Sequence, residues 1–276
     1  MQVLTEINIF PIKSLGGIRA QCATLTDRGL KYDRRWMLVD QEGKFLTQRT
    51  RPIMSQLLVD VQGDNLYVRN RQVKDDDLLI PVQSDRWHPR SVTVWKDECQ
   101  ALAYPKVIND WFSKRIGVTC ELVYMPDDSD RPVDANLSIA KEQVSFADSF
   151  PMMIIGESSL ADLNARLDEP VSMDRFRPNL VYSGGQAFAE DSWKRIRVGS
   201  IEFAVIKPCP RCVMTTVDPL TSEVGHEPLK TLTTYRKQKN GVMFGQNLLH
   251  AVDGEIKVGD VITVIESSNA SEVEAK

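Results

Sequence analysis

Short stretches that alternate apolar and polar residues recur through the first hundred positions of the chain, with turn residues between them. The stretches are rich in β-branched, aromatic and leucine side chains, and the turns fall about every 8–12 residues. This spacing is typical of antiparallel barrels and sandwiches. Strands are expected in this half at residues 3–10, 20–25, 36–39, 57–61, 66–68 and 91–94.

The rest of the chain adds a few helices to further strands. Residues 105–116 place apolar side chains at helical spacing, which predicts a helix. Residues 126–137 are rich in Asp and Pro and have no period, so we place a domain boundary near residue 126. The pattern predicts a mixed α/β chain that is predominantly β. Later strands are expected at residues 151–156, 193–198, 201–206 and 261–265, helices after residue 158 and near 229–238, and a disordered tail at 267–276.

One stretch, residues 207–219, reads KPCPRCVMTTVDP and holds two of the five cysteines. Pro208 and Pro210 exclude a helix between them and remove backbone donors. The β-branched runs on either side predict a strand at 201–206, a rigid loop carrying both cysteines, and a second strand at 213–217. A reactive side chain on such a loop would be held in a defined position.

Cys212 is the first candidate for chemistry in this loop. Lys207 and Arg211 are near it in sequence, and nearby cations favour the thiolate form. Four interpretations are open: a redox pair with Cys209, a zinc site that includes His226, two packed cysteines, or a thiolate that binds a soft metal or acts as a nucleophile. The β-branched run that follows argues against the redox pair, which normally opens a helix.

Composition narrows the class of protein. The chain has 276 residues, a net charge of −4 and 42% hydrophobic residues, which is ordinary for a globular protein and does not indicate a general nucleic-acid binder. We see no run of membrane-spanning length and no secretory signal. An odd number of scattered cysteines fits a reducing compartment, so we expect a cytoplasmic protein with no membrane or nucleic-acid partner.

Hydrogen-bond donors gather at turns and strand ends, where binding sites are usually built. Arg34 and Arg35 would enter a strand on opposite faces, one inward and one toward solvent. Together the donors would suit a flat, polar, phosphorylated ligand. The positions are Lys13, Ser14, Arg34, Arg177, Asn179, Arg211 and an expected tight turn at residues 244–247.

Many short motifs of this chain occur, in order, in one known family. The chain resembles the MOSC family, in the branch that has a MOSC N-terminal β-barrel domain and includes YcbX-type proteins and the mitochondrial amidoxime reducing component. The resemblance implies an N-terminal β-barrel-like domain at 1–125 and a MOSC β-barrel domain at 126–266, with a few peripheral helices. The motifs are PIKSLGG, GLKYDRRWMLVD, SFADSFP, SSLADLNARL, FRPNLVYSGG, EDSW, KPCPRCVMTTVDP, EPLKTL, FGQN and IKVGD.

The resemblance also implies a cofactor and its contacts. The family binds the molybdenum cofactor, a pyranopterin whose dithiolene holds the metal, and Cys212 matches the cysteine that supplies a thiolate to it. Ser149 and Phe150 fall where two more contacts lie, and Pro210 replaces a serine that is often found between the two cysteines. The residues that match cofactor-binding positions are Lys13, Ser14, Arg34, Arg177, Asn179, Arg211 and Asn247.

The activity implied by the resemblance is the reduction of N-hydroxylated compounds such as amidoximes, hydroxylamines and N-hydroxylated bases, a detoxification reaction. Relatives of the YcbX type often carry a ferredoxin domain. Cys22, Cys99 and Cys120 are too isolated to form such a cluster, so electrons are expected from a separate flavin or iron–sulfur protein. The alternative is a carrier that delivers sulfur or the molybdenum cofactor through Cys212.

Overall fold

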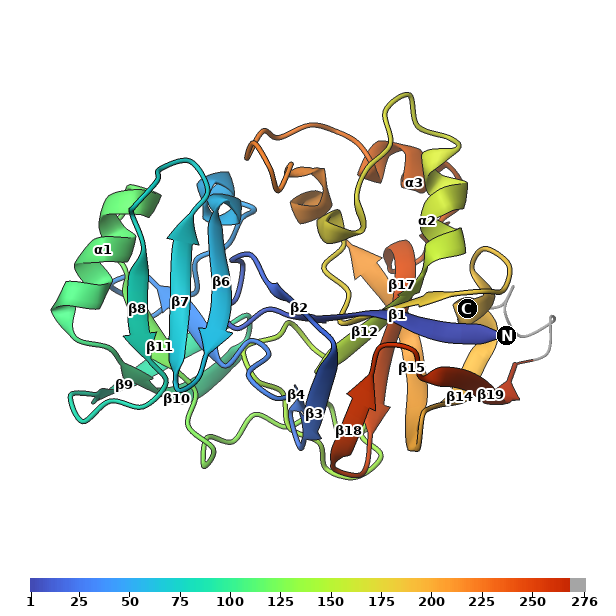
Figure 1. Cartoon of the computed structure of the whole chain (residues 1–276), viewed down its shortest axis with the longest axis horizontal. Coiled ribbons are helices and arrows are strands. Elements are labelled where there is room, and N and C mark those ends of the chain that lie inside the picture. The colour runs from blue at the N-terminus through green and yellow to red at the C-terminus, as the bar shows by residue number, and fades with distance from the viewer. Residues whose placement is uncertain (269–276) are drawn as a thin grey trace.

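The computed structural model describes residues 1–268 of the chain, and within them 42% of residues are in strands and 16% are helical. Figure 1 shows two lobes side by side: one holds β6 to β11 and α1, and the other holds β1 with the strands of the second half of the chain. The sequence prediction of a predominantly β protein is therefore confirmed.

The described elements are as follows. The strands are β1 (Gln2–Ile9), β2 (Ile18–Ala20), β3 (Cys22–Thr26), β4 (Gly29–Leu30), β5 (Trp36–Val39), β6 (Leu57–Gln62), β7 (Asn65–Asn70), β8 (Leu78–Pro81), β9 (His88–Val94), β10 (Asp97–Ala103), β11 (Glu121–Tyr124), β12 (Met152–Gly156), β13 (Leu180–Ser183), β14 (Trp193–Val198), β15 (Ile201–Arg211), β16 (Lys237–Gln238), β17 (Gly241–His250), β18 (Gly254–Lys257) and β19 (Val261–Ser267). The helices are α1 (Lys106–Ile116), α2 (Glu157–Asn164) and α3 (Leu229–Tyr235), and the 3-10 helices are η1 (Pro52–Gln56), η2 (Met173–Arg175), η3 (Ala189–Ser192) and η4 (Val213–Thr216).

Seven strands close into a barrel in the order β12-β13-β1-β19-β14-β15-β17, and β17 pairs with β12 to complete the ring. The first strand of the chain thus lies between β13 and β19, among strands that follow residue 150. Strands from both sides of residue 126 build this barrel, and the boundary placed there from the sequence stays a prediction.

Side-chain alternation along the barrel strands separates two cores. In β12, Met152 and Ile154 belong to a cluster to which all seven barrel strands contribute, so this cluster fills the interior. Met153 and Ile155 point the other way, into a second cluster with Leu163 of α2 and other apolar residues. Because β12 is buried on both faces, it reads as a continuous apolar run in the sequence.

The other lobe contains two further sheets, β5-β11-β10-β9 and β6-β7-β8. Helix α1 buries Ile108, Phe112 and Ile116, which lie four residues apart on one face, and it ends at Gly117 with a φ of +75°. Glycine is favoured at that position because the left-handed conformation strains other residues. No helix within residues 1–268 is long and apolar enough to cross a membrane.

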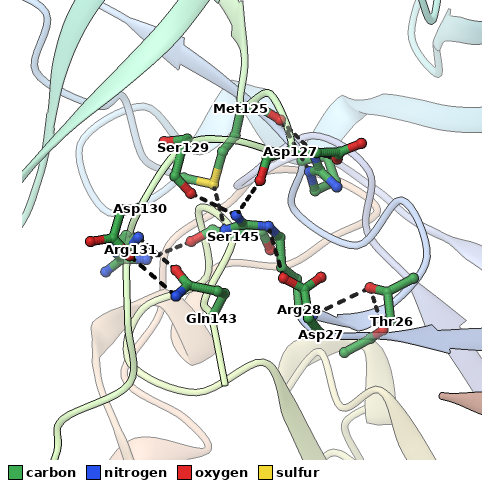
Figure 2. A network of polar contacts seen from close by, with 12 residues as sticks. Thr26, Asp27, Arg28, Met125, Asp127, Ser129, Asp130, Arg131, Gln143 and Ser145 are labelled. Carbon is green, nitrogen blue, oxygen red and sulfur yellow. Dashed lines mark hydrogen bonds and ion pairs between the residues drawn. The ribbon is translucent and has the colours of Figure 1, made fainter. Parts of the chain in front are cut away.

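The segment after β11, which reads as a linker in the sequence, is held in place by two buried arginines (Figure 2). Arg28 donates to the carbonyls of Asp127 and Ser129, at 3.0 and 2.6 Å. Arg131 donates to the carbonyls of Ser145 and Ala147, both at 2.6 Å, and of Asp148 at 2.9 Å. The loop before β12 is therefore bound to the turn between β3 and β4 by Arg28 and braced internally by Arg131.

Two local predictions around Cys212 are wrong. The expected loop is part of β15, which continues to Arg211, and register shifts around the prolines let them occupy a strand without breaking the ladder. The expected strand at 213–217 is instead η4. The hydroxyl groups of Thr215 and Thr216 donate to the carbonyls three residues earlier, which favours a helical turn over an extended chain.

Three other expectations also need comment. The tight turn expected at residues 244–247 is wrong, because these residues continue β17 and Gly245 alone takes a positive φ, +84°. The prediction that either Arg34 or Arg35 faces solvent is also wrong, because Arg35 donates to the carbonyl of Met125 and pairs with Asp127. The prediction assumed strand alternation, but Arg34 precedes β5 and has a φ of +50°, so alternation does not apply there. Residues 269–276 of the expected tail lie outside the described part of the chain.

Candidate functional site

One pocket contains every residue that the sequence placed in the cofactor site. It lies where the two lobes meet, and it is lined from one lobe by the turn after β1 and the loop after β5, and from the other by β15, β17 and the loop before β12. The predicted residues on its wall are Lys13, Ser14, Arg34, Arg177, Asn179, Arg211, Cys212 and Asn247, together with Ser149 and Phe150. Their individual roles remain predictions.

Cys212 lies at the end of β15, where the chain turns into η4. Its side chain is half-buried and its thiol is free, as is that of Cys209. The cation beside the Cys212 sulfur is Arg49, whose Nη1 lies 3.6 Å from Sγ. The sequence suggested Lys207 and Arg211 for this position. The structure assigns it to a residue from the other lobe.

Arg211 points away from Cys212. Its Nη2 donates to the carbonyl of Phe176 at 2.6 Å, while Nη1 lies 3.1 Å from the sulfur of Cys209 and 3.0 Å from that of Met153. Its Nε is buried and has no hydrogen-bond partner within residues 1–268. A buried N–H without an acceptor is costly, so this position favours a ligand that brings one.

Lys13 and Asp148 form an ion pair on the pocket wall. Lys13 Nζ lies 2.5 Å from Oδ1 of Asp148 and donates to the carbonyl of Phe146 at 2.7 Å. Burial lowers the pKa of Lys13, and Asp148 offsets part of this effect. Desolvation in the pocket opposes ionisation of Asp148. The charge and N–H donation of Lys13 outweigh that desolvation and hold the carboxyl pKa well below its usual range.

Arg34 is anchored by the interior of the protein. Its Nη1 donates to Oδ2 of Asp33 at 2.5 Å and to the side-chain oxygen of Asn179 at 3.0 Å. Burial raises the pKa of Asp33, and Arg34 works against this rise. The amide nitrogen of Asn179 in turn donates to the carbonyl of Asn8, at 3.1 Å, in β1. This chain of bonds ties the pocket floor to the first strand.

Arg177 is the least satisfied charge in the pocket. Its side chain is 9% exposed and packs on the ring of Phe10, 4.1 Å from the centroid, yet its guanidinium has no hydrogen-bond acceptor within residues 1–268. Burial and the neighbouring Arg34 lower the pKa of Arg177 to about 9. Its φ is +54°, a left-handed conformation that is uncommon for non-glycine residues. Its guanidinium is therefore available to an anion bound in the pocket.

Two of the predicted residues act through their backbones or their neighbours. Ser14 has a φ of +66°, and its carbonyl accepts a hydrogen bond of 2.7 Å from the side chain of Gln48. The amide of Asn247 donates to the carbonyls of Lys207 and Pro208, where β15 bulges. Asn247 thereby supports the strand that carries the two cysteines.

Sequence reasoning missed two charged residues of the pocket wall, Arg49 and Asp148. Arg49 lies in an irregular loop with no periodic pattern, so its sequence contained no signal that it reaches Cys212. Asp148 stands in SFADSFP, a stretch that marked the family but not a charge in the pocket. Both positions depend on contacts between the lobes.

The charge of the pocket is opposite to that of the whole chain. The chain carries a net charge of −4, whereas five cations and a single carboxylate line this pocket. Cations arranged around a cleft attract and orient anions. Within residues 1–268, no group of three or more His, Cys, Asp or Glu side chains could hold a metal ion. The site therefore combines a wall of cations with the free, half-buried thiols of Cys209 and Cys212.

The fold and this pocket define a MOSC protein, and the chain belongs to the MOSC domain family. Residues 1–119 match the MOSC N-terminal beta barrel domain, and residues 141–263 match the MOSC domain. The chain is 32% identical to mitochondrial amidoxime-reducing component 1 of Homo sapiens over 284 residues, which covers 95% of this chain and 82% of that protein.

A second relative is the molybdenum cofactor sulfurase of Oryza sativa subsp. japonica, 32% identical over 88% of this chain. The chain spans only 32% of the sulfurase's length. Among solved structures, the YUAD protein from Bacillus subtilis matches over 95% of this chain and 94% of that chain with a TM-score of 0.42 and 8% identity, which is too distant to support an argument.

Proposed function

We propose that this protein binds the molybdenum cofactor and uses it to reduce N-hydroxylated compounds. The observation that carries the proposal is the unsatisfied charge of the pocket, above all the buried Arg177 guanidinium without an acceptor. The orphaned Nε of Arg211 and the thiol of Cys212 lie on the same wall. A ligand that is anionic, rich in acceptors and bound to a soft metal satisfies all three.

The residues fit the parts of this cofactor. Lys13 and Arg34, both anchored by carboxylates, would bind its phosphate. Arg177 and Arg211 would donate to the carbonyl and ring nitrogens of the pterin, and Asn179 would hold Arg34 in place. Cys212 would supply one thiolate to the metal.

When bound, the cofactor supplies two-electron redox chemistry at the metal, and the protein orients the reactants and tunes the metal. Reduction of an N–OH group breaks the N–O bond, consumes two electrons and two protons, and releases the amine and water. The electrons would come from a separate flavin or iron–sulfur protein. Asp148 is ionised at neutral pH, so it would orient donors rather than deliver a proton.

The first experiment measures molybdenum and oxidised pterin in protein purified from a host that makes the cofactor. We expect near-stoichiometric amounts of both in the wild-type protein. Cys212→Ala should lose the metal, and Arg34→Ala should lose both the metal and the pterin. Loaded protein should then reduce benzamidoxime when a chemical electron donor is added. Absence of both metal and pterin from the wild-type protein would reject the proposal.

The alternative function is a sulfur or cofactor carrier, which the likeness to a molybdenum cofactor sulfurase favours. A carrier needs Cys212 to exchange its load, whereas a reductase keeps its cofactor. Incubation of loaded protein with a cofactor-free molybdoenzyme separates the two. Rapid transfer of cofactor, or of labelled persulfide sulfur, with no amidoxime reduction would favour the carrier.

A further inference from the structure

The lobe that holds β9 and β10 contributes its own residues to the thiol end of the pocket. Arg49, in the loop between β5 and η1, lies 3.6 Å from the sulfur of Cys212, although the two residues are 163 positions apart. Its guanidinium also stacks on Trp95, 4.4 Å from the ring centroid. None of the sequence arguments assigned a role to either Arg49 or Trp95.

Trp95 has a backbone conformation that is unfavourable for a bulky side chain. It is the first of the two turn residues between β9 and β10, and its φ is +59°. A bulky residue rarely adopts this left-handed conformation, for which hairpin turns favour glycine or asparagine. Its side chain is also 49% exposed, so burial does not explain its presence. Strain of this kind is usually maintained where it serves a function.

The contacts of Trp95 show what the strained turn achieves. Its indole N–H donates to Oδ1 of Asp148 at 3.1 Å, and its ring packs on Phe45, 5.2 Å between centroids. One side chain thus joins the β9–β10 turn to a pocket-lining carboxylate and to the pocket-lining Arg49. Since Asp148 also binds Lys13, the orientation of Arg49 is coupled to that of the anion-binding wall.

We propose that Arg49 is a substrate-binding residue that holds the oxygen of the N–OH group at the Cys212 end of the pocket, and that Trp95 is the residue that positions it. As the N–O bond breaks, the oxygen gains negative charge before it leaves as water. A guanidinium N–H directed at that oxygen stabilises the charge as it forms. This inference rests on the proposed reductase function, and it assigns the oxygen-binding role to the lobe that does not carry Cys212.

The test uses two alkylating reagents on ligand-free protein. Iodoacetate is an anion and iodoacetamide is neutral, and both react with the thiolate, so the ratio of their rates is independent of how much thiolate is present. Peptide mass spectrometry gives that ratio for Cys212 and, as an internal reference, for the exposed Cys22. Arg49→Gln should lower the ratio at Cys212 about fivefold and leave it unchanged at Cys22.

Matched variants separate positioning from folding. Arg51→Gln removes a nearby exposed charge and should change nothing. Trp95→Gly relieves the strained turn but should lower the ratio of the iodoacetate rate to the iodoacetamide rate at Cys212. Trp95→Phe keeps a ring against Arg49, so its ratio should be close to that of the wild type. A ratio that Arg49→Gln leaves unchanged would overturn the role of Arg49, and one that Trp95→Gly leaves unchanged would overturn that of Trp95.

Loaded protein provides the second measurement. Arg49→Gln should keep its molybdenum and pterin but lose at least tenfold in kcat/KM for benzamidoxime. Full activity in this variant would overturn the inference while the proposed function stands. Failure of the wild-type protein to take up molybdenum would instead reject the proposed reductase function. If Arg49→Gln still lowered the alkylation ratio at Cys212 in that case, Arg49 would keep only a role in binding anions.

Discussion

Two pairs of buried arginines in this protein have opposite surroundings. Arg28 lies in the turn between β3 and β4 and Arg131 in the loop before β12, and the carbonyl oxygens of that loop accept hydrogen bonds from both guanidinium groups (Figure 2). Arg177 and Arg211 lie on the pocket wall. The Arg177 guanidinium faces the pocket and donates to no group within the described residues, and Arg211 has a buried Nε without a partner. Arg28, Arg131 and Arg177 are buried and Arg211 is partly buried, so burial alone does not separate the two pairs.

The difference lies in where each charge finds its partner. A buried guanidinium that the chain itself satisfies stabilises the fold, and removing it leaves carbonyl groups without donors. A buried guanidinium that the chain does not satisfy destabilises the ligand-free protein and is retained for a ligand. Arginines whose N–H groups find acceptors within the protein therefore have a structural role, and those without such acceptors have a binding role. Mutation of one arginine from each pair tests this distinction.

The largest effect on folding is expected for Arg131→Met. Arg131 is 4% exposed and donates to three backbone carbonyls in the loop at 145–148. Loss of these bonds should lower the free energy of unfolding by about 3–5 kcal/mol, measured by urea denaturation. Arg131→Lys, which keeps one donor group, should recover part of the lost free energy of unfolding. A loss under about 1 kcal/mol would show that the loop is not held by this residue.

Arg177→Met should have the opposite profile. The substitution removes an unpaired buried charge at similar volume, so ligand-free protein should be unchanged or more stable by about 1 kcal/mol. Cofactor retention should fall at least tenfold, because a charge-assisted hydrogen bond is worth about 1.5–3 kcal/mol. Thermal denaturation with and without bound cofactor measures both. Marked destabilisation of the ligand-free variant would place Arg177 with the structural pair.

Asp148 joins the two regions, and the smallest effect is expected there. Its backbone carbonyl accepts from Arg131, while its carboxylate accepts from Lys13. Because its pKa is lowered in the folded protein, it contributes stability above the unfolded pKa of about 4, and this stability is lost as the pH falls below that value. Wild type should exceed Asp148→Asn in stability at pH 7, and the difference should shrink toward pH 3. A difference independent of pH would exclude this ion pair as its source.

Local pattern was sufficient where neighbouring residues decide the structure. The helix at 105–116 was predicted within a residue of α1, because its apolar side chains repeat at helical spacing. The strands predicted at 193–198 and 201–206 appear as β14 and β15, which pair antiparallel. The stretch around Cys212 was mispredicted, because the pairing of β15 with β17 extends the strand through two prolines that local rules place in a loop.

For this protein, the sequence by itself determined the strand-rich class, most of the elements, the family and the candidate residues that share one pocket, but not the whole pocket wall. Motifs and periodicity are local properties, so they can be found without the fold. Only the tertiary structure decided that β1 completes a barrel with strands of the second half, and that Arg49 rather than Lys207 or Arg211 is the cation beside Cys212. The physical reason is that strand pairing and charge contacts depend on distance in space, and a contact across 163 positions has no signature in the residues around either partner.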